Sequence, residues 1–436
     1  MHYFKYRKNE LFCEEVRVQD IIERFGTPCY IYSYRTIIEH FHKIAKAFIE
    51  LEPLICYSMK ANSNLAICRI LVNEGAGLDI VSGGELFRAL CVGADGKKIV
   101  FAGVGKTDNE IKEAIKAKIL FFNVESEPEL ERIQAIAVQM HKVVNACIRI
   151  NVGVNPNTHS YITTAIKDSK FGVSFAVARK ILRYQNRFFN INIRGLHFHI
   201  GSQITEVTPY VEAIKKITLF IEGLKKDGIR LEYLNIGGGM GINYKNDDAK
   251  TARALAEAIV PLLKKTGLKI ILEPGRFIVG SAGILVTKVT YLKNTEYRDF
   301  IILDSAMNDL IRPTLYQSYH EIIPLNNTST KTKKYDVVGS ICESGDFFAK
   351  DRDIPLVKQG DYLAIMCAGA YGFSMSSNYN SRLKPAEVLV KDGSFYLIRK
   401  RQTYEDLIDN ERIPLFLKDK LPRRLKIELK RKFFKE

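Results

Sequence analysis

The sequence predicts an α/β fold, a (β/α)8 TIM barrel, followed by a C-terminal all-β domain. Up to about residue 275, short apolar runs typical of buried strands alternate with longer segments in which apolar residues recur every three or four positions. Eight strands in this alternation are typical of a TIM barrel, whereas each half of a doubly wound sheet usually has fewer. After Gly275 most strand-like segments follow one another without a long helix, which indicates a separate β domain.

The expected elements follow in chain order. The barrel strands are LICYS (54–58), GLDIV (77–81), KIVFAG (98–103), ILFFNV (119–124), ACIRINV (146–152), IRGLHFHI (193–200), LEYLNIG (231–237) and KIILEPG (269–275). Residues 109–118 and 252–265 are two of the amphipathic helices between them. The β domain includes GILVTKVTYLK, RDFIILD, KYDVVGSI, DYLAIMC and AEVLVKDGSFYLIRK.

The chain, with 436 residues and 46% apolar content, is long enough to form two hydrophobic cores. We expect an N-terminal segment (1–28), a barrel that carries a cofactor (29–276), a β domain (277–408) and a basic tail (409–436). The strand-like FKYRKNELFCEE of the N-terminal segment needs a partner sheet, so we expect it to pair with the β domain.

The composition limits the classes of partner. The chain carries a net charge of +16, but a net +6 of this lies in residues 411–436, and much of the rest lies on helix-like segments, where charges usually face solvent. No nucleic-acid motif is visible, and no stretch resembles a membrane span or a signal peptide. The eight cysteines form no C-x-x-C pair. We therefore expect a cytoplasmic protein with reduced thiols and with no metal, nucleic acid or membrane partner.

Polar residues gather where the predicted strands end. Active sites of TIM barrels are built from the carboxyl ends of the strands. Taken singly, a strand-terminal lysine, a core histidine or a glycine turn each has a common structural explanation, and their joint placement on one rim favours a site. The residues are Lys60; Asp79, Ser82, Gly83, Gly84 and Glu85; Arg149 and Asn151; His197, His199, Gly201, Ser202 and Gln203; Gly237, Gly238, Gly239 and Gly241; Glu273 and Arg276.

The chemistry of these residues points to pyridoxal 5'-phosphate (PLP). A glycine-rich turn that runs from a strand toward a helix offers backbone N–H groups to a phosphate. His199 can lie flat against an aromatic ring, Glu273 can hold a pyridine nitrogen protonated, and Lys60 can form a Schiff base with an aldehyde. Together these groups describe a PLP site.

Several motifs resemble those of the diaminopimelate decarboxylase family, which belongs to the alanine-racemase-like (group IV) PLP decarboxylases. The resemblance extends from about Gly26 to Gln402 and departs modestly at Ser58, Met59, Leu383 and Lys384, and in the basic tail. The motifs are YSMKAN, HIGSQ, GGGMG, EPGR, RPTLY (312–316), CESGD (342–346) and GAYG (369–372).

The resemblance implies roles for individual residues. Lys60, Cys342 and His199 would be catalytic: Lys60 would carry PLP, Cys342 would donate a proton and His199 would stack on the ring. The implied cofactor-binding set is Lys60, Asp79, His199, Ser202, Gly237, Gly238, Gly239, Glu273, Gly275, Arg276 and Tyr371. The implied substrate-binding set is Arg276, Arg312, Tyr316, Glu343 and Tyr371.

The implied reaction is the decarboxylation of meso-2,6-diaminopimelate to L-lysine and CO2, the last step of lysine biosynthesis. Cys342 and Glu343 would come from the neighbouring subunit of a homodimer with shared active sites. Glu273 disfavours a racemase, because racemases of this fold place an arginine against the pyridine nitrogen. Three alternatives stay open: a related decarboxylase of arginine, ornithine or carboxynorspermidine; a non-catalytic PLP carrier, which Lys60 and Cys342 argue against; and a tail that also binds acidic partners.

Overall fold

The computed structural model describes residues 2–155, 169–245 and 249–418 and contains the predicted barrel. Eight parallel strands close in the order β10-β11-β12-β5-β6-β7-β8-β9. In chain order they are β5 (Leu54–Ser58), β6 (Gly77–Ile80), β7 (Ile99–Phe101), β8 (Phe121–Val124), β9 (Val144–Arg149), β10 (Ile191–His197), β11 (Tyr233–Asn235) and β12 (Lys269–Leu272). Six of them lie within the segments expected from the sequence, and β9 and β10 overlap theirs but begin two residues earlier.

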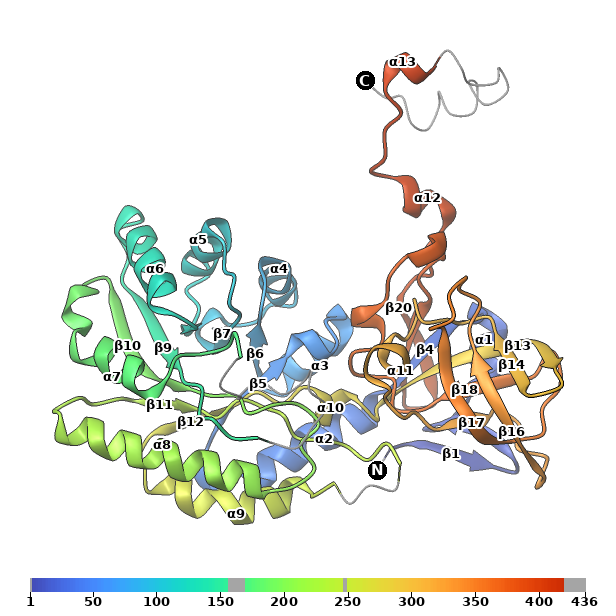
Figure 1. The fold of residues 1–436 in the computed structure, drawn as a ribbon, viewed down its shortest axis with the longest axis horizontal. Helices are drawn as coiled ribbons and strands as arrows, with labels where there is room; N and C mark the ends of the chain where they lie inside the picture. Colours follow the sequence, from blue (N-terminus) through green and yellow to red (C-terminus); the bar gives the residue numbers. More distant parts are fainter. Residues whose placement is uncertain (1, 156–168, 246–248, 419–436) are drawn as a thin grey trace.

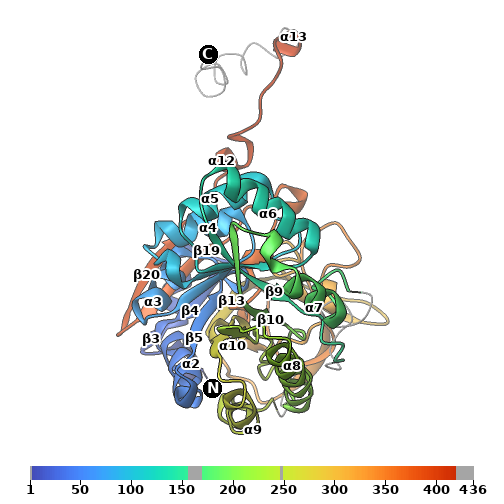
Figure 2. The same ribbon diagram turned by 90° about the vertical axis from the view of Figure 1, so that its left-hand side faces the viewer.

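Helices surround the barrel strands, as Figure 2 shows in a view from the barrel side. The two amphipathic helices expected from the sequence are confirmed as α5 and α9, and a Thr107–Glu110 capping box explains why α5 begins where it does. The helices are α2 (Tyr34–Ala47), α3 (Leu65–Asn73), α4 (Gly83–Cys91), α5 (Asp108–Lys116), α6 (Glu127–Gln139), α7 (Phe175–Arg183), α8 (Thr208–Lys226), α9 (Ala252–Lys264) and the short α10 (Arg276–Val279).

The β domain lies beside the barrel, on the right in Figure 1. Its main path of strands runs β17-β16-β14-β13-β4-β19-β20, and β18 joins β13 to β15. The strands are β4 (Cys29–Ser33), β13 (Gly283–Asn294), β14 (Asp299–Leu303), β15 (Ile322–Pro324), β16 (Thr332–Val338), β17 (Phe347–Pro355), β18 (Tyr362–Ile365), β19 (Ala386–Lys391) and β20 (Ser394–Arg399). The helices α11 (Arg312–Tyr316), α12 (Tyr404–Ile408) and α13 (Leu415–Lys418) complete this half.

Strand β4 lies in a different unit from the one expected. The predicted domain boundary at residue 29 assigned this strand to the barrel, and the structure places it in the β domain. It pairs with β13 in antiparallel fashion and with β19 in parallel fashion, so it lies inside the sheet of the β domain. All five of its residues are buried, and a strand buried in this way needs hydrogen-bond partners on both edges. We therefore propose that the barrel unit begins after Ser33, with α2.

The N-terminal segment forms a small antiparallel sheet of its own, β1 (Phe4–Arg7), β2 (Glu10–Cys13) and β3 (Val16–Arg17), followed by α1 (Val18–Phe25). The sheet meets the β domain where the Leu11 N–H donates to the Leu325 carbonyl oxygen at 2.8 Å. Phe4 and Leu11 also pack into one hydrophobic cluster with Ile284 of β13 and Val388 of β19. The segment thus contacts the β domain through this packing and through an isolated antiparallel bridge between Glu10 and Asn326.

Two further properties concern the described residues as a set. None of their helices combines the length and hydropathy needed to cross a membrane. No group of three or more His, Cys, Asp or Glu side chains among them could hold a metal ion. The basic tail predicted for 409–436 lies outside the described residues from position 419 onward.

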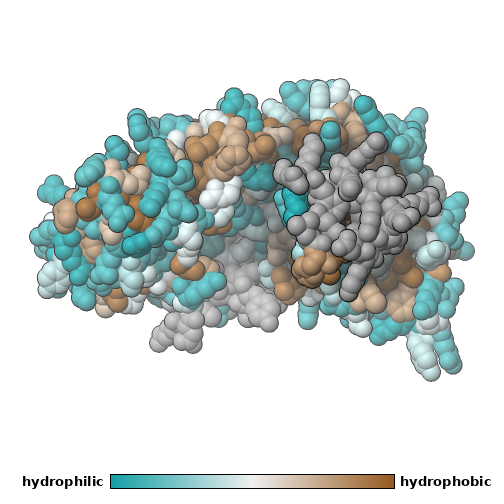
Figure 3. Space-filling model, turned by 90° about the horizontal axis from the view of Figure 1, so that it is seen from above, coloured by the Kyte–Doolittle hydropathy of each residue, from teal (hydrophilic) through white to brown (hydrophobic). Residues whose placement is uncertain are grey.

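The face of the molecule that is seen from above carries patches of hydrophobic surface that alternate with polar surface (Figure 3).

Candidate active site

Lys60 lies in a single 3-10 turn, Met59–Ala61, directly after β5. The β domain holds this turn from outside the barrel: the Tyr371 N–H and the Ser374 hydroxyl both donate to the Ala61 carbonyl oxygen, at 2.8 and 3.1 Å. Asn62 donates to the Gly369 carbonyl oxygen at 3.2 Å. Contacts between the two domains therefore fix the turn that carries Lys60.

The Lys60 ammonium donates to Asp79 Oδ2 at 2.7 Å, and the Ser58 hydroxyl donates to the same oxygen at 2.5 Å. Burial opposes a charged amine, but the negative charge of Asp79 and the hydrogen bond to it raise the pKa of Lys60 above its ordinary value. Asp79 is fully buried, whereas Lys60 is only half-buried. The lysine is therefore the member of this pair that a ligand in the barrel mouth can reach.

Glu273, just after β12, lies at the centre of a buried polar network. Its Oε1 accepts from the side-chain amides of Asn235 at 2.5 Å and Asn123 at 3.2 Å, and its Oε2 lies 3.3 Å from His197 Nε2. Burial opposes ionisation, but His197, Lys60 and Asn235 together hold the pKa of Glu273 below its ordinary value. The carboxylate is therefore charged, and its Oε2 keeps a lone pair for a further donor.

His199 follows β10 and lies beside the glycine turn after β11. Its Nδ1 accepts from the Gly238 N–H at 3.2 Å. Burial, with the nearby charges of Arg149 and Lys60, lowers the pKa of His199 well below its ordinary value, so the ring is a neutral flat surface.

The turn formed by Gly237, Gly238 and Gly239 requires glycine because neighbouring atoms lie where a Cβ atom would be. A Cβ on Gly238 would lie 2.0 Å from the Glu273 carbonyl oxygen, and one on Gly239 would lie 2.3 Å from that of Gly201. At Gly237, with φ of +67°, a Cβ would lie 2.8 Å from His199 Nδ1. Gly275, next to Ser58, is similarly close, with 3.0 Å to the Ser58 Cβ.

A second group of predicted residues lies around Arg276, the first residue of α10. Its Nη2 donates to the Ser202 hydroxyl at 3.1 Å, and its guanidinium carbon lies 4.8 Å from the centre of the Tyr371 ring. Its Nη1 donates to the hydroxyl of Tyr244, which also accepts from Arg312. The structure thus brings together four predicted residues from four separate segments, with Tyr244 between the two arginines.

Cys342 and Glu343 lie in neither group. They are exposed in the turn between β16 and β17. The Cys342 N–H donates to Asn380 Oδ1 at 3.0 Å, and Glu343 accepts from the Tyr379 hydroxyl. Tyr316 is half-buried at the end of α11, four residues after Arg312.

Four site residues were missed by the sequence analysis: Asn123, Asn235, Tyr244 and His320. The two asparagines carried a usable signal, since each is a polar residue inside an apolar strand and is fully buried. Tyr244 and His320 carried none, because their positions depend on contacts between loops far apart in the sequence.

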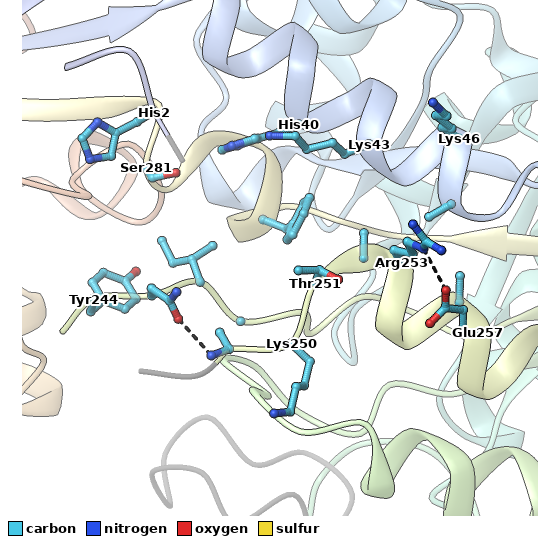
Figure 4. Close-up of a pocket in the computed structure, with 18 of the residues that line it drawn as sticks. His2, His40, Lys43, Lys46, Tyr244, Lys250, Thr251, Arg253, Glu257 and Ser281 are labelled. Atoms are coloured by element: carbon cyan, nitrogen blue, oxygen red, sulfur yellow. Dashed lines mark hydrogen bonds and ion pairs between the residues drawn. The ribbon is translucent and has the colours of Figure 1, made fainter. Parts of the chain in front are cut away.

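A cavity of about 1280 Å³ borders the site at Tyr244. It runs between α2 and α9, and Figure 4 shows Tyr244 and His2 at one end, with Lys46 and Arg253 at the other. Lys60, His199 and Glu273 are not among its lining residues, so this cavity adjoins the candidate active site without containing it.

Comparison with known proteins decides the family. Residues 34–280 match the family model described as "Pyridoxal-dependent decarboxylase, pyridoxal binding domain". The diaminopimelate decarboxylase of Aquifex aeolicus is 48% identical over 93% of this chain and 97% of its own length, and that of Vibrio cholerae is 44% identical over 93% and 98%. The chain belongs to the diaminopimelate decarboxylase family. The resemblance found in the motifs is thereby confirmed.

Solved structures of diaminopimelate decarboxylases share the whole architecture. The Helicobacter pylori enzyme complexed with L-lysine is 40% identical, with a TM-score of 0.86 over 89% of this chain and 98% of its own. The M. jannaschii enzyme, also in complex with L-lysine, is 38% identical, with a TM-score of 0.91 over 95% and 98%. The barrel and β domain are therefore those of the diaminopimelate decarboxylases.

The residues around Lys60 fit the PLP of this family. Asp79 Oδ1 is buried with no hydrogen-bond partner, Glu273 is a charged carboxylate with a free lone pair, and His199 is a neutral ring beside them. The glycine turn, Ser202 and Arg276 are donors of the kind that bind a phosphate. The predicted cofactor, PLP, is confirmed by the match to a pyridoxal-binding domain.

Proposed function

We propose that this protein decarboxylates meso-2,6-diaminopimelate to L-lysine and CO2, with PLP as cofactor. The observation that carries the proposal is the pairing of a PLP-type barrel rim with two buried arginines, Arg276 and Arg312, which have no carboxylate partner among the described residues. The substrate carries a second amino-carboxylate far from the reacting carbon. A pair of buried guanidiniums is suited to bind that carboxylate.

The residues of the chain supply binding, orientation and proton control. When bound, PLP supplies an aldehyde that captures an amine and a ring that accepts the electron pair released with CO2. Lys60 provides the amine that holds the cofactor, and Asp79 keeps that lysine in place. Glu273 would keep the pyridine nitrogen protonated, and the flat ring of His199 would lie against the cofactor ring. Ser202 and the glycine turn would receive the phosphate, and Arg276 borders this place through its hydrogen bond to Ser202.

The substrate end is formed by Arg276, Arg312, Tyr316 and Tyr371, with Glu343 as the partner of the distal ammonium. Cys342 or Lys60 returns a proton to the carbon that has lost CO2. Since Cys342 and Glu343 are exposed on their own chain, we propose that they act in the site of a second copy, in a homodimer with shared active sites. The eight free cysteines support a cytoplasmic location, where thiols stay reduced.

A mixture of inactive Lys60→Ala and Cys342→Ala subunits is expected to regain activity. If each site combines Lys60 of one subunit with Cys342 of the other, a hybrid dimer has one site with neither defect. Random exchange should then restore up to about a quarter of wild-type turnover. Native mass spectrometry checks that hybrids have formed, and Cys91→Ala, at the other exposed cysteine, should stay active. Hybrids without activity would place both residues in the site of one chain.

The alternative substrates arginine, ornithine and carboxynorspermidine are not favoured. The relatives that match over nearly the whole chain are diaminopimelate decarboxylases. A lysine/ornithine decarboxylase of Vibrio vulnificus is only 23% identical, a likeness that shows the fold alone. The direct test is release of L-lysine from meso-diaminopimelate by the purified protein, which should require PLP.

A further inference from the structure

Arg276 and Arg312 form an unusual buried pair of like charges. Arg276 is 6% exposed and Arg312 is 4% exposed. Neither forms an ion pair with an Asp or Glu that the structure describes. The Nε atom of each is buried without an acceptor. Burying a guanidinium without an anion is costly, so this arrangement favours an anionic ligand.

The two guanidiniums are joined by one neutral oxygen. Tyr244 Oη accepts from Arg276 Nη1 at 2.7 Å and from Arg312 Nη1 at 2.8 Å. A phenol oxygen has two lone pairs, and these two bonds use both. The Tyr244 ring is held as well: the Arg312 guanidinium carbon lies 4.8 Å from its centre, and the His320 ring meets it edge-on at 5.2 Å.

His320 fixes the far side of Arg312. Its Nδ1 lies 2.8 Å from the Met366 carbonyl oxygen, which can only accept, so Nδ1 carries the hydrogen. Its Nε2 must then accept from Arg312 Nη1, at 3.0 Å. Burial, with the charge of Arg312, lowers the pKa of His320 to about 3, which keeps this acceptor neutral. Both hydrogens of Arg312 Nη1 are thus used by the protein.

The remaining donors are left for a ligand. In each arginine the Nη1 atom is tied to Tyr244, while the Nε–H has no acceptor. A carboxylate binds a guanidinium through two parallel N–H donors, so the orientation of each guanidinium decides whether both donors can be reached at once. Ser202 binds only Arg276, and Ser318 and His320 bind only Arg312, whereas the Tyr244 oxygen accepts from both guanidiniums.

We propose that Tyr244 is a positioning residue for substrate specificity, which holds Arg276 and Arg312 as a two-armed receptor for the carboxylate at the unreacted end of the substrate. The inference rests on the proposed function and extends it to a residue outside the sets of cofactor and substrate contacts given above. A Tyr244→Phe variant removes the shared oxygen and keeps the ring, so it separates the bridge from the packing. Tyr319→Phe is the matched control, because the Tyr319 ring contacts Arg352 and Lys245 and not the arginine pair.

Two ligands separate the carboxylate from the amines. L-lysine has the carboxylate that the product keeps, and 1,5-diaminopentane has the same chain and both amines without it. Each ligand is titrated into the PLP-loaded protein, and its binding is measured by calorimetry and by cofactor absorbance. We expect Tyr244→Phe to raise the Kd of L-lysine roughly 10-fold or more, the range for losing hydrogen bonds to charged groups. The Kd of 1,5-diaminopentane, the PLP content and the Tm should stay near wild type. For meso-diaminopimelate, KM should rise with little change in kcat.

Each other outcome has a definite meaning. Equal weakening of both ligands, or a similar effect of Tyr319→Phe, would show a general structural role and overturn the proposal. Unchanged or tighter L-lysine binding in Tyr244→Phe would show that the phenol does not organise the arginines and would also overturn it. If the wild-type protein binds L-lysine no better than 1,5-diaminopentane, its site does not recognise the distal carboxylate, and this would contradict the proposed diaminopimelate specificity.

Discussion

A Lys60→Ala variant is expected to lose nearly all turnover, roughly a thousandfold or more, and to hold PLP weakly. In the pair formed with buried Asp79, half-buried Lys60 is the residue that a ligand can reach, and its proposed roles are to anchor the cofactor and to carry a proton. Turnover on meso-diaminopimelate and the absorbance of the purified variant in the near-ultraviolet and visible range measure the two losses.

Borohydride treatment of the wild-type protein, followed by peptide mapping, should place the cofactor on Lys60. Lys106 is a matched comparison on the same rim, since it follows β7 and its side chain is buried. Its amine already donates to Glu129 and to the carbonyl oxygens of Gly103 and Asn123, at 2.7 to 2.9 Å, so it should carry no label. A label on Lys106 would contradict the assignment of Lys60.

An Arg312→Ala variant is expected to keep PLP and lose substrate. Its guanidinium contacts Tyr244, His320 and Ser318, none of which is among the groups around Lys60. Removing it should lower kcat/KM for meso-diaminopimelate. The fall should correspond to a loss of about 2 to 5 kcal/mol in transition-state binding free energy, the range for losing a buried charged partner. Steady-state kinetics and cofactor absorbance check the two halves of the expectation.

Arg298→Ala is the control for Arg312→Ala. Arg298 is an exposed residue of the β domain that pairs with Asp336, so its loss should leave kcat/KM unchanged. Loss of PLP in Arg312→Ala, or an equal loss of activity in Arg298→Ala, would show that the mutation acts through stability and not through the substrate.

The barrel and its rim could be predicted because both depend on local patterns. Eight apolar runs gave the strands, and a functional rim at strand ends follows from how parallel strands align. Lys60 and Glu273 stood out because each directly follows such a strand. Asn123 and Asn235 were missed because, inside short apolar strands, nothing local shows that their amides converge on one carboxylate.

Other features depend on contacts between distant segments, which a single sequence does not reveal. Strand β4 pairs with strands more than 250 residues later, so its place in the β domain was not visible from its apolar pattern. Tyr244 meets Arg312, 68 residues away, only because a barrel loop reaches the β domain. Cys342 and Glu343 stand exposed, and their proposed role needs a second copy of the chain.

The rate of L-lysine release from meso-diaminopimelate, compared with decarboxylation of L-ornithine, L-arginine and L-lysine by the same PLP-loaded protein, tests the central claim most directly. The three comparison substrates lack a second carboxylate for the arginine pair. We expect one L-lysine for each CO2 released from meso-diaminopimelate and a strong preference for it, with no turnover when PLP is removed. Equal rates on any of the three would contradict the diaminopimelate assignment.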